Sequence, residues 1–353
     1  MDYPFVDKFN KVHGGLPALL RVGATELMIG VTCQKADRGP IYYYDLILVP
    51  NPNSSAGFEI REQLLVENGD VPATAVFSRV GRIAQVKSQK QPELTKLDSM
   101  DERATLIAAW GRSFGEPWAK DVVDILSAID VHVPFDIHPK WTTSETASGS
   151  PRASNIVQPT PALLRGAGNL ANAYYSLRNR RDWPETLDYV RLGLGAHILD
   201  VTTQPDPAGG IIALLVEDDR YKTRFPATAL SDGTVAFLAY VALFRLNNRM
   251  AMIAFDEPET HLHPELLLRV VGMFETLGRE TTVLISTHSD RVLDGLTNPS
   301  ESVVLTDLDE SGSTKLIRPN AQTLERWLEG YRYRGLGDIR ADGHVRSVLT
   351  RRS

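Results

Sequence analysis

Residues 250–265 read MAMIAFDEPETHLHPE, an apolar run followed by acidic residues and two histidines. The apolar run predicts a short buried strand that ends in two carboxylates, Asp256 and Glu257. In open parallel sheets, ligands bind at the carboxyl ends of the strands. One carboxylate there can hold Mg²⁺ through water, and a second can orient or deprotonate an attacking water, which are the acidic roles of phosphate-ester hydrolysis. The alternative is that both acids cap the next helix, whose first turn is marked by Pro264.

Two further stretches place polar groups beside this one. Residues 281–290 read TTVLISTHSD, so a second apolar strand brings His288 to the same sheet edge. Residues 229–234 read ALSDGT and open an apolar helix. A helix start offers free N–H groups and a positive dipole end, and both attract a phosphate-like anion. Taken singly, His288 is better explained as a capping or core histidine, and the Ser231–Asp232 pair is better explained as an ordinary helix cap.

The hydrophobic pattern outside these motifs predicts an α/β fold. An antiparallel β region is expected over residues 25–86, where strand-like runs are separated by short polar connections. Helical spacing follows, with two strands near residues 197–218. From residue 230 onward, apolar strands alternate with helices, which predicts a parallel sheet covered by helices on both faces. Strands are expected at 25–33, 42–51, 58–69, 74–86, 250–256, 281–287 and 302–308, and helices at 101–114, 117–129, 162–179, 184–194, 233–246, 264–278 and 290–296.

These patterns divide the chain into four parts. Residues 1–97 are expected to form a β-rich part. Residues 98–225 are expected to form a mostly helical insertion with a mobile, Ser/Thr/Ala-rich loop at 142–155. Residues 226–320 carry the three motifs. Residues 321–353 are expected to form a helix and a basic tail.

The net charge, the length of the longest apolar run and the number of cysteines make some classes of protein less plausible than others. The chain has 353 residues and a net charge of −6, which argues against strong, sequence-independent DNA binding. Any DNA contact would be local, at the cluster Arg178, Arg180 and Arg181 or in the tail, although a solvated face explains such clusters better. The longest apolar run is too short to span a bilayer, no signal peptide is evident, and a single cysteine, Cys33, suits a reducing cytoplasm.

The order LSDGT, strand-DEPE, strand-THS resembles the C-terminal half of an ABC-type ATPase head. The segments DEPETHLHPE and ISTHSDRVLD are similar to sequences of the RecF/SMC/OLD-like predicted ATPases of the AAA superfamily, a group of P-loop NTPases. The segments GAGNLANAYYSLR and LERWLEGYRYRGLGD are also similar to parts of that group, so the resemblance covers most of the chain.

The resemblance implies a role for each motif. Two heads would sandwich two ATP molecules in a homodimer, and the signature motif of one head would contact ATP held by the other. Asp256 would support Mg²⁺, Glu257 would activate water, and His288 would sense the γ-phosphate. The signature residues would be Leu230, Ser231, Asp232 and Gly233, and the D-loop residues that couple the two sites would be Pro258, Glu259, Thr260 and His261.

One motif of that family is missing from the sequence. The Walker A loop, GxxxxGK[ST], cradles the nucleotide phosphates, and neither His13–Gly15 nor residues 149–155 nor residues 166–169 match it. The family's P-loop helix runs on into a segment that resembles residues 5–20, which would place the Walker A lysine just before Met1. Either the chain is truncated, which the intact Glu257 favours, or it is a degenerate relative. In both cases we expect weak ATP binding by this chain alone.

The leading hypothesis is an ATPase whose nucleotide-driven dimerisation acts on a partner or in a DNA-related process such as repair or phage defence. The alternative is a non-hydrolysing interaction module, which the absent Walker A motivates. A DNA-end factor that uses the arginine clusters is a third possibility, and a nuclease or other effector would be a separate chain. A zinc site at His261, His263 and Glu265 has too few ligands, since structural zinc takes four.

Overall fold

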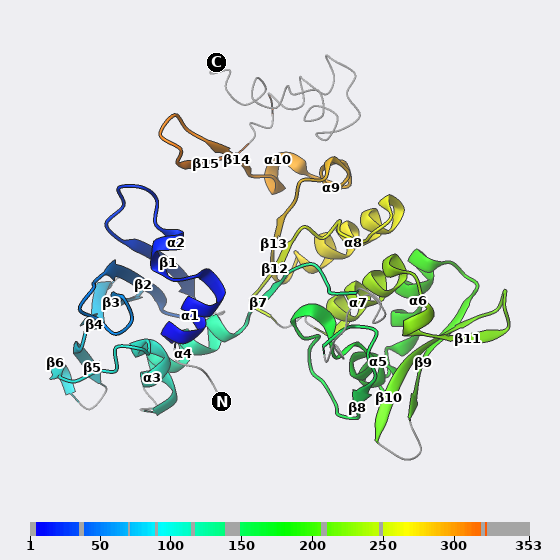
Figure 1. Ribbon diagram of the computed structural model, residues 1–353, viewed down its shortest axis with the longest axis horizontal. Helices are drawn as coiled ribbons and strands as arrows, with labels where there is room; N and C mark the ends of the chain where they lie inside the picture. Colours follow the sequence, from blue (N-terminus) through cyan, green and yellow to red (C-terminus); the bar gives the residue numbers. More distant parts are fainter. Residues whose placement is uncertain are drawn as a thin grey trace. The chain divides into compact units, whose positions relative to one another are not determined.

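The computed structural model describes residues 5–34, 39–69, 71–88, 91–113, 117–137, 149–205, 210–246, 250–318 and 322. The chain forms two compact units, Met1–Ala128 and Ile129–Ser353 (Figure 1). The sequence placed a boundary after residue 97 instead. The helices α3 (Leu106–Ser113) and α4 (Pro117–Ser127) belong to the first unit, because they pack against its sheet.

The first unit is built on a six-stranded antiparallel sheet in simple sequence order. Alternation decides which face is buried. In β2, Tyr42, Tyr44, Leu46 and Leu48 point into the core and their neighbours do not. Two helices, α1 (Phe5–His13) and α2 (Leu16–Leu19), contribute Val6, Phe9 and Leu16 to that core. The strands are β1 (Leu27–Gln34), β2 (Ile41–Pro50), β3 (Phe58–Asn68), β4 (Val71–Val80), β5 (Ile83–Ser88) and β6 (Gln91–Leu97).

The predicted antiparallel region is present, with one more hairpin than expected. Residues 74–86 fall into two paired strands, β4 and β5, because Gly81 adopts a φ of +58° and reverses the chain. The sequence analysis did not identify β6 at all. Its sequence, QPELTKL, combines proline with two charged residues and so lacks the β-branched and aromatic pattern that marks a strand.

A buried carboxylate joins the sheet of the first unit to α3. Glu62 on β3 is only 2% exposed, and it accepts hydrogen bonds from the main-chain N–H groups of Leu106 (2.6 Å) and Ile107 (3.3 Å) at the start of α3. Tyr44 Oη donates at 2.9 Å, and Arg79 Nη1 lies 3.2 Å away. These partners compensate the burial of the charge, which explains why α3 stays with the sheet.

The second unit contains the predicted parallel sheet, with strand order β13-β12-β7. The strands are β7 (Ile129–His132), β12 (Met252–Asp256) and β13 (Thr282–Ser286). One face packs on α7 (Asp232–Leu246) and α8 (Pro264–Leu277) through Phe255, Tyr240 and Phe274. On β13, Leu284 is 59% exposed. Among the described residues, helices therefore cover one face of this sheet, where the sequence predicted cover on both.

The remaining strands of the second unit are antiparallel. The segment 302–308 was expected to belong with the parallel strands, but β14 (Leu305–Leu308) forms a hairpin with β15 (Thr314–Ile317). A second sheet contains β8 (Asn155–Ile156), β9 (Ile198–Pro205), β10 (Ile211–Asp218) and β11 (Thr223–Pro226). Beside it lie α5 (Leu170–Arg178) and α6 (Trp183–Leu194) (Figure 1). The 3-10 turn η3 (Ala227–Ala229) contacts β10 and β11, whereas η2 (Arg165–Ala167) contacts β7. Further along the chain come α9 (Asp290–Asp294) and α10 (Pro299–Ser302).

Residues 98–225 therefore hold strands as well as helices, and the helix expected at 162–179 begins only at Leu170, after the turn η2. The predicted mobile loop is described from Gly149 onward, where the chain is fixed by buried side chains of Ser150 and Arg152. Its earlier part and the tail from residue 323 lie outside the described residues. No helix in the described part of the chain is long and apolar enough to cross a membrane.

Candidate functional site at the carboxyl ends of β12 and β13

Asp256 and Glu257 stand where β12 ends. The parallel register pairs Asp256 with Ser286, the last residue of β13, and the Ser286 hydroxyl donates to Asp256 Oδ1. The Glu257 main-chain N–H donates to the Ser286 carbonyl at 2.9 Å. Glu257 has a φ of +46°, an uncommon conformation for a residue with a side chain. The chain therefore turns sharply after β12, and a strained backbone of this kind often marks a functional site.

The turn after β12 is tied to the loop after β13. Glu259 Oε1 accepts hydrogen bonds from the Thr287 hydroxyl at 2.7 Å and from the His288 main-chain N–H at 3.0 Å. Its other oxygen, Oε2, is buried and has no hydrogen-bond partner among the described residues. Sequence analysis placed Glu259 in the D-loop but did not foresee this bridge between the two loops.

His288 and Glu257 face each other across these loops. His288 Nε2 lies 3.9 Å from Glu257 Oε1, and the two side chains are 83% and 47% exposed. A pair this exposed adds little to stability, because water screens it. Both groups are instead accessible to a substrate. The structure therefore brings Asp256, Glu257 and His288 together at one sheet edge, as the motif order predicted.

The start of α7 lies against the same turn. Ser231 Oγ accepts a hydrogen bond from the Thr234 main-chain N–H at 3.1 Å, which is the geometry of a helix cap. A Cβ atom on Gly233 would stand 3.1 Å from the His261 carbonyl oxygen, so this approach favours glycine. Tyr240 Oη donates to the Pro258 carbonyl at 3.0 Å, and burial raises the Tyr240 pKa well above its ordinary value. The predicted signature and D-loop segments are therefore neighbours in one unit.

Arg152, whose side chain is almost fully buried, was not predicted from the sequence as a site residue. It donates to the Ile137, Ala227 and Leu230 carbonyls at 2.6–2.7 Å and to Asp232 Oδ1 at 2.5 Å. Its acceptors thus include two of the predicted signature residues. The only sequence signal was a single arginine in a Ser/Thr/Ala-rich stretch, which reads as loop.

His132 was also missed, although it ends the strand next to β12. It is fully buried, stacks on Phe255 with ring centroids 5.4 Å apart, and its Nε2 lies 2.8 Å from Asp130 Oδ2. Its Nδ1 has no hydrogen-bond partner among the described residues. A histidine at the end of a four-residue strand carries too little pattern to be singled out from sequence.

The donor set at the sheet edge suits magnesium. Asp256 and the Ser286 hydroxyl supply hard oxygen atoms, which Mg²⁺ prefers, at an exposed position. The zinc alternative is not supported: His263 Nδ1 accepts a hydrogen bond from the Glu265 main-chain N–H at 3.4 Å and caps α8. No group of three or more His, Cys, Asp or Glu side chains in the described ranges could hold a metal ion.

Two arginines of the cluster, Arg178 and Arg180, are paired with aspartates of the second unit. Arg178 Nη1 lies 2.6 Å from Asp200 Oδ2, and Arg180 lies 2.6 Å from Asp182 Oδ2. Arg178 also stacks over Trp183, with its guanidinium 5.7 Å from the ring centroid. These contacts give Arg178 and Arg180 a structural role within the second unit. The basic tail lies outside the described residues.

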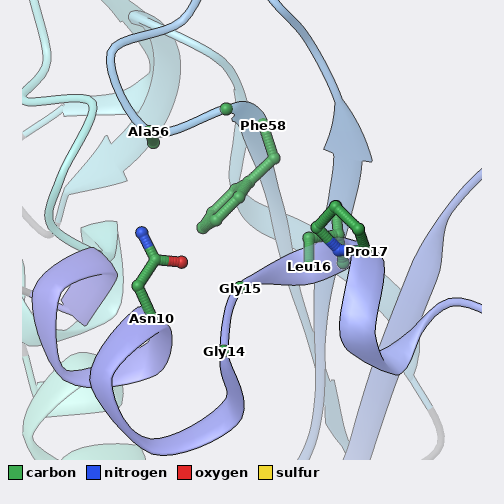
Figure 2. A pocket seen from close by; sticks show the side chains of 8 residues that line it. Asn10, Gly14, Gly15, Leu16, Pro17, Ala56 and Phe58 are labelled. Carbon is green, nitrogen blue, oxygen red and sulfur yellow. The ribbon is translucent and has the colours of Figure 1, made fainter.

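A hollow of about 350 Å³ opens in the first unit beside the His13–Gly15 turn. Figure 2 shows Asn10, Ala56 and Phe58 around it, with Gly14 and Gly15 on the adjoining loop. The residues that line it carry no charged side chain, so it lacks the lysine with which a Walker A loop binds phosphate.

Several solved structures are similar to this chain. The SMC head domain from Thermotoga maritima is 8% identical, with 80% of this chain and 75% of that chain covered and a TM-score of 0.34. The Smc head domain with an extended coiled coil bound to the C-terminal domain of ScpA, from Pyrococcus furiosus, is 12% identical, with 83% and 80% covered and a TM-score of 0.36. No curated protein matches the chain.

A protein family matches the part of the chain that holds the site. Residues 139–294 match the family described as "AAA domain, putative AbiEii toxin, Type IV TA system". The matched segment contains Arg152, α7, β12, Glu257 and His288, so it covers both the start of α7 and the carboxyl ends of β12 and β13. Residues 139–294 are therefore similar to this family of AAA domains, which supports the resemblance to an ABC-type ATPase head that the motifs indicated.

Proposed function

We propose that the second unit takes part in binding and hydrolysing Mg-ATP, and that nucleotide drives two copies to associate. The observation that carries the proposal is the convergence of Asp256, Glu257 and His288 at one sheet edge. The family match supports ATPase chemistry for this segment. The close docking of α7 on the turn after β12 supports a single functional unit.

Each residue at the edge has a distinct role in this proposal. Asp256 holds Mg²⁺, which neutralises charge on the phosphates when it is bound. Glu257 orients the attacking water and accepts its proton as the water oxygen bonds to the γ-phosphorus and the bond to the ADP oxygen breaks. His288 donates a hydrogen bond to the γ-phosphate. Glu257 and His288 are exposed enough to reach a substrate.

The start of α7 in one copy contacts the ATP that is held by the facing copy. Its first N–H groups and the Ser231 hydroxyl offer donors to the γ-phosphate of ATP held by that copy. Because the Pro258–His261 turn contacts α7, a movement at either one is passed to the other. ATP bound between two copies therefore joins them, and hydrolysis releases them.

A second candidate function is a non-hydrolysing interaction module. The observation that favours it is the lack of a GxxxxGK[ST] loop in these 353 residues. Such a module would keep the fold and the association surface without turnover. A partner chain, an effector nuclease or DNA could be its target. The pairing of Arg178 and Arg180 with aspartates favours a protein partner over DNA at that cluster.

Equilibrium binding of Mg-ATP tests the proposal. Two forms are compared: the 353-residue chain, and the same chain preceded by a strand–GxxxxGK[ST]–helix segment. We expect binding of about millimolar affinity in the first and micromolar in the second, because backbone N–H groups and the lysine cradle the phosphates. In the second form, Asp256→Asn should remove the dependence on Mg²⁺. Failure of both forms to bind ATP overturns the proposal, and micromolar binding by the 353-residue chain shows that another loop supplies the cradle.

A further inference from the structure

Arg152 is a buried cation that contacts the predicted signature segment. Its side chain is 2% exposed, and three of its nitrogen atoms, Nε, Nη1 and Nη2, donate hydrogen bonds. A buried guanidinium is tolerated only when its charge and its donors find partners. The surrounding chain therefore provides hydrogen-bond acceptors and a compensating charge for this one side chain.

The acceptors of Arg152 converge on the residues that precede and open α7. Nη1 donates to the Ala227 carbonyl at 2.6 Å and to the Leu230 carbonyl at 2.7 Å, while Nη2 donates to Asp232 Oδ1 at 2.5 Å. Nε donates to the Ile137 carbonyl at 2.7 Å. One side chain thus joins the segment that follows β7 to the first turn of α7, and it fixes the path of the chain into that turn.

The positive charge of Arg152 also neutralises the carboxylate of Asp232. Asp232 lies in the first turn of α7, and its side chain is 42% exposed. An unpaired carboxylate there would repel a phosphate from the N–H groups of the same turn. The guanidinium cancels this negative charge. Because a bidentate or forked contact needs a planar donor, lysine cannot reproduce the full set of bonds.

We propose that Arg152 is a positioning residue that holds the start of α7 in place and neutralises Asp232, so that this turn can accept the γ-phosphate of ATP. The phosphate contact rests on the function proposed above, whereas the holding of the turn does not. Arg152 touches no reacting atom in this scheme. It acts through Leu230 and Asp232.

Hydrogen–deuterium exchange of residues 227–235 tests the holding role in the nucleotide-free 353-residue chain. In Arg152→Gln, we expect exchange to be faster by about tenfold or more, because the turn loses its anchor and opens locally. Arg152→Lys should fall between the two, since it keeps the charge but loses the fork. Arg178→Gln, which removes an arginine paired elsewhere in the unit, is the matched control and should leave residues 227–235 unchanged. Unchanged exchange in both Arg152 variants overturns the proposal.

The same peptide, followed at saturating Mg-ATP in the form that carries the GxxxxGK[ST] segment, tests the charge role. We expect added protection in the wild type and in Asp232→Asn, and none in Arg152→Gln. The double variant Arg152→Gln/Asp232→Asn should regain the protection, because the carboxylate that needed neutralising is gone. Loss of protection in Asp232→Asn, or no recovery in the double variant, contradicts the charge role. If the wild type itself does not respond to Mg-ATP, the proposed function fails, and the nucleotide-free comparison still decides the holding role.

Discussion

Glu259 and His288 are joined by a hydrogen bond in which the His288 main-chain N–H donates to Glu259 Oε1 at 3.0 Å. The bond connects the turn after β12 with the loop after β13. It sets the position of the His288 backbone without occupying its imidazole ring. A change in the conformation of the turn, such as one caused by contact with a facing copy, would therefore move the backbone of His288.

Removing this carboxylate should uncouple the two loops. In Glu259→Ala, the Thr287 hydroxyl and the His288 N–H lose their acceptor, so we expect a loss of about 1–3 kcal/mol in the free energy of unfolding. Where ATP turnover is measurable, kcat should fall by about tenfold while KM changes little, because His288 is misplaced for the transition state. Glu265→Ala on the exposed first turn of α8 is the control. Urea unfolding and steady-state kinetics check both, and unchanged values in Glu259→Ala would refute the bridge.

Two helical glycines should respond to alanine in opposite ways. A Cβ on Gly272 of α8 meets nothing within 4 Å, whereas a Cβ on Gly233 of α7 would stand 3.1 Å from the His261 carbonyl. Gly272→Ala should therefore stabilise the fold by about 0.5–1 kcal/mol through helix propensity alone. Gly233→Ala should gain less or lose stability, because the start of α7 must move away from the turn. Equal stabilisation in urea unfolding of both variants would show that the contact at Gly233 is loose.

Asp182 should contribute to the acid sensitivity of the second unit. Hydrogen bonds from Arg180 and the nearby charges of Arg180 and Arg245 hold the pKa of Asp182 below its ordinary value. The unfolded chain then binds this proton more readily than the folded chain. The stabilisation is present above the unfolded pKa of about 3.9 and is lost as pH falls through the lower folded pKa.

Asp182→Asn should remove that part of the pH dependence. We expect a loss of about 1 kcal/mol at pH 7 and a smaller difference from the wild type at pH 3, since the pair is partly exposed. The slope of unfolding free energy against pH between pH 3 and pH 5 reports it. Asp188→Asn, whose exposed carboxylate lies 4.0 Å from Arg191, is the control. A difference between Asp182→Asn and the wild type that grows toward pH 3 would contradict the assignment.

The site could be predicted from sequence wherever one short stretch carried the information. Asp256 and His288 each follow an apolar strand, and parallel strands place their ends together, so pattern alone predicted that they meet. Arg152 could not be found in this way. Its partner Asp232 lies 80 positions further along the chain, and its own surroundings resemble a loop.

The fold shows the same division. Strong alternation in β2 and the apolar core of α7 made both elements predictable. The hairpin of β14 with β15 was not, because an apolar strand that follows a helix looks the same whether it joins a parallel sheet or pairs locally. The exposed face of β13 also could not be foreseen, since the apolar residue Leu284 reads as buried.

Glu257 is proposed as the base of an ATP hydrolysis site, and single-turnover hydrolysis shows whether its carboxylate is needed for the chemical step. Wild type and Glu257→Gln are compared in the form that carries a GxxxxGK[ST] segment, with Mg-ATP binding measured in parallel. We predict that Glu257→Gln binds Mg-ATP within about threefold of the wild type but hydrolyses it about 100-fold more slowly or worse, because the amide cannot accept the proton of the attacking water. Hydrolysis at the wild-type rate in Glu257→Gln would contradict the account.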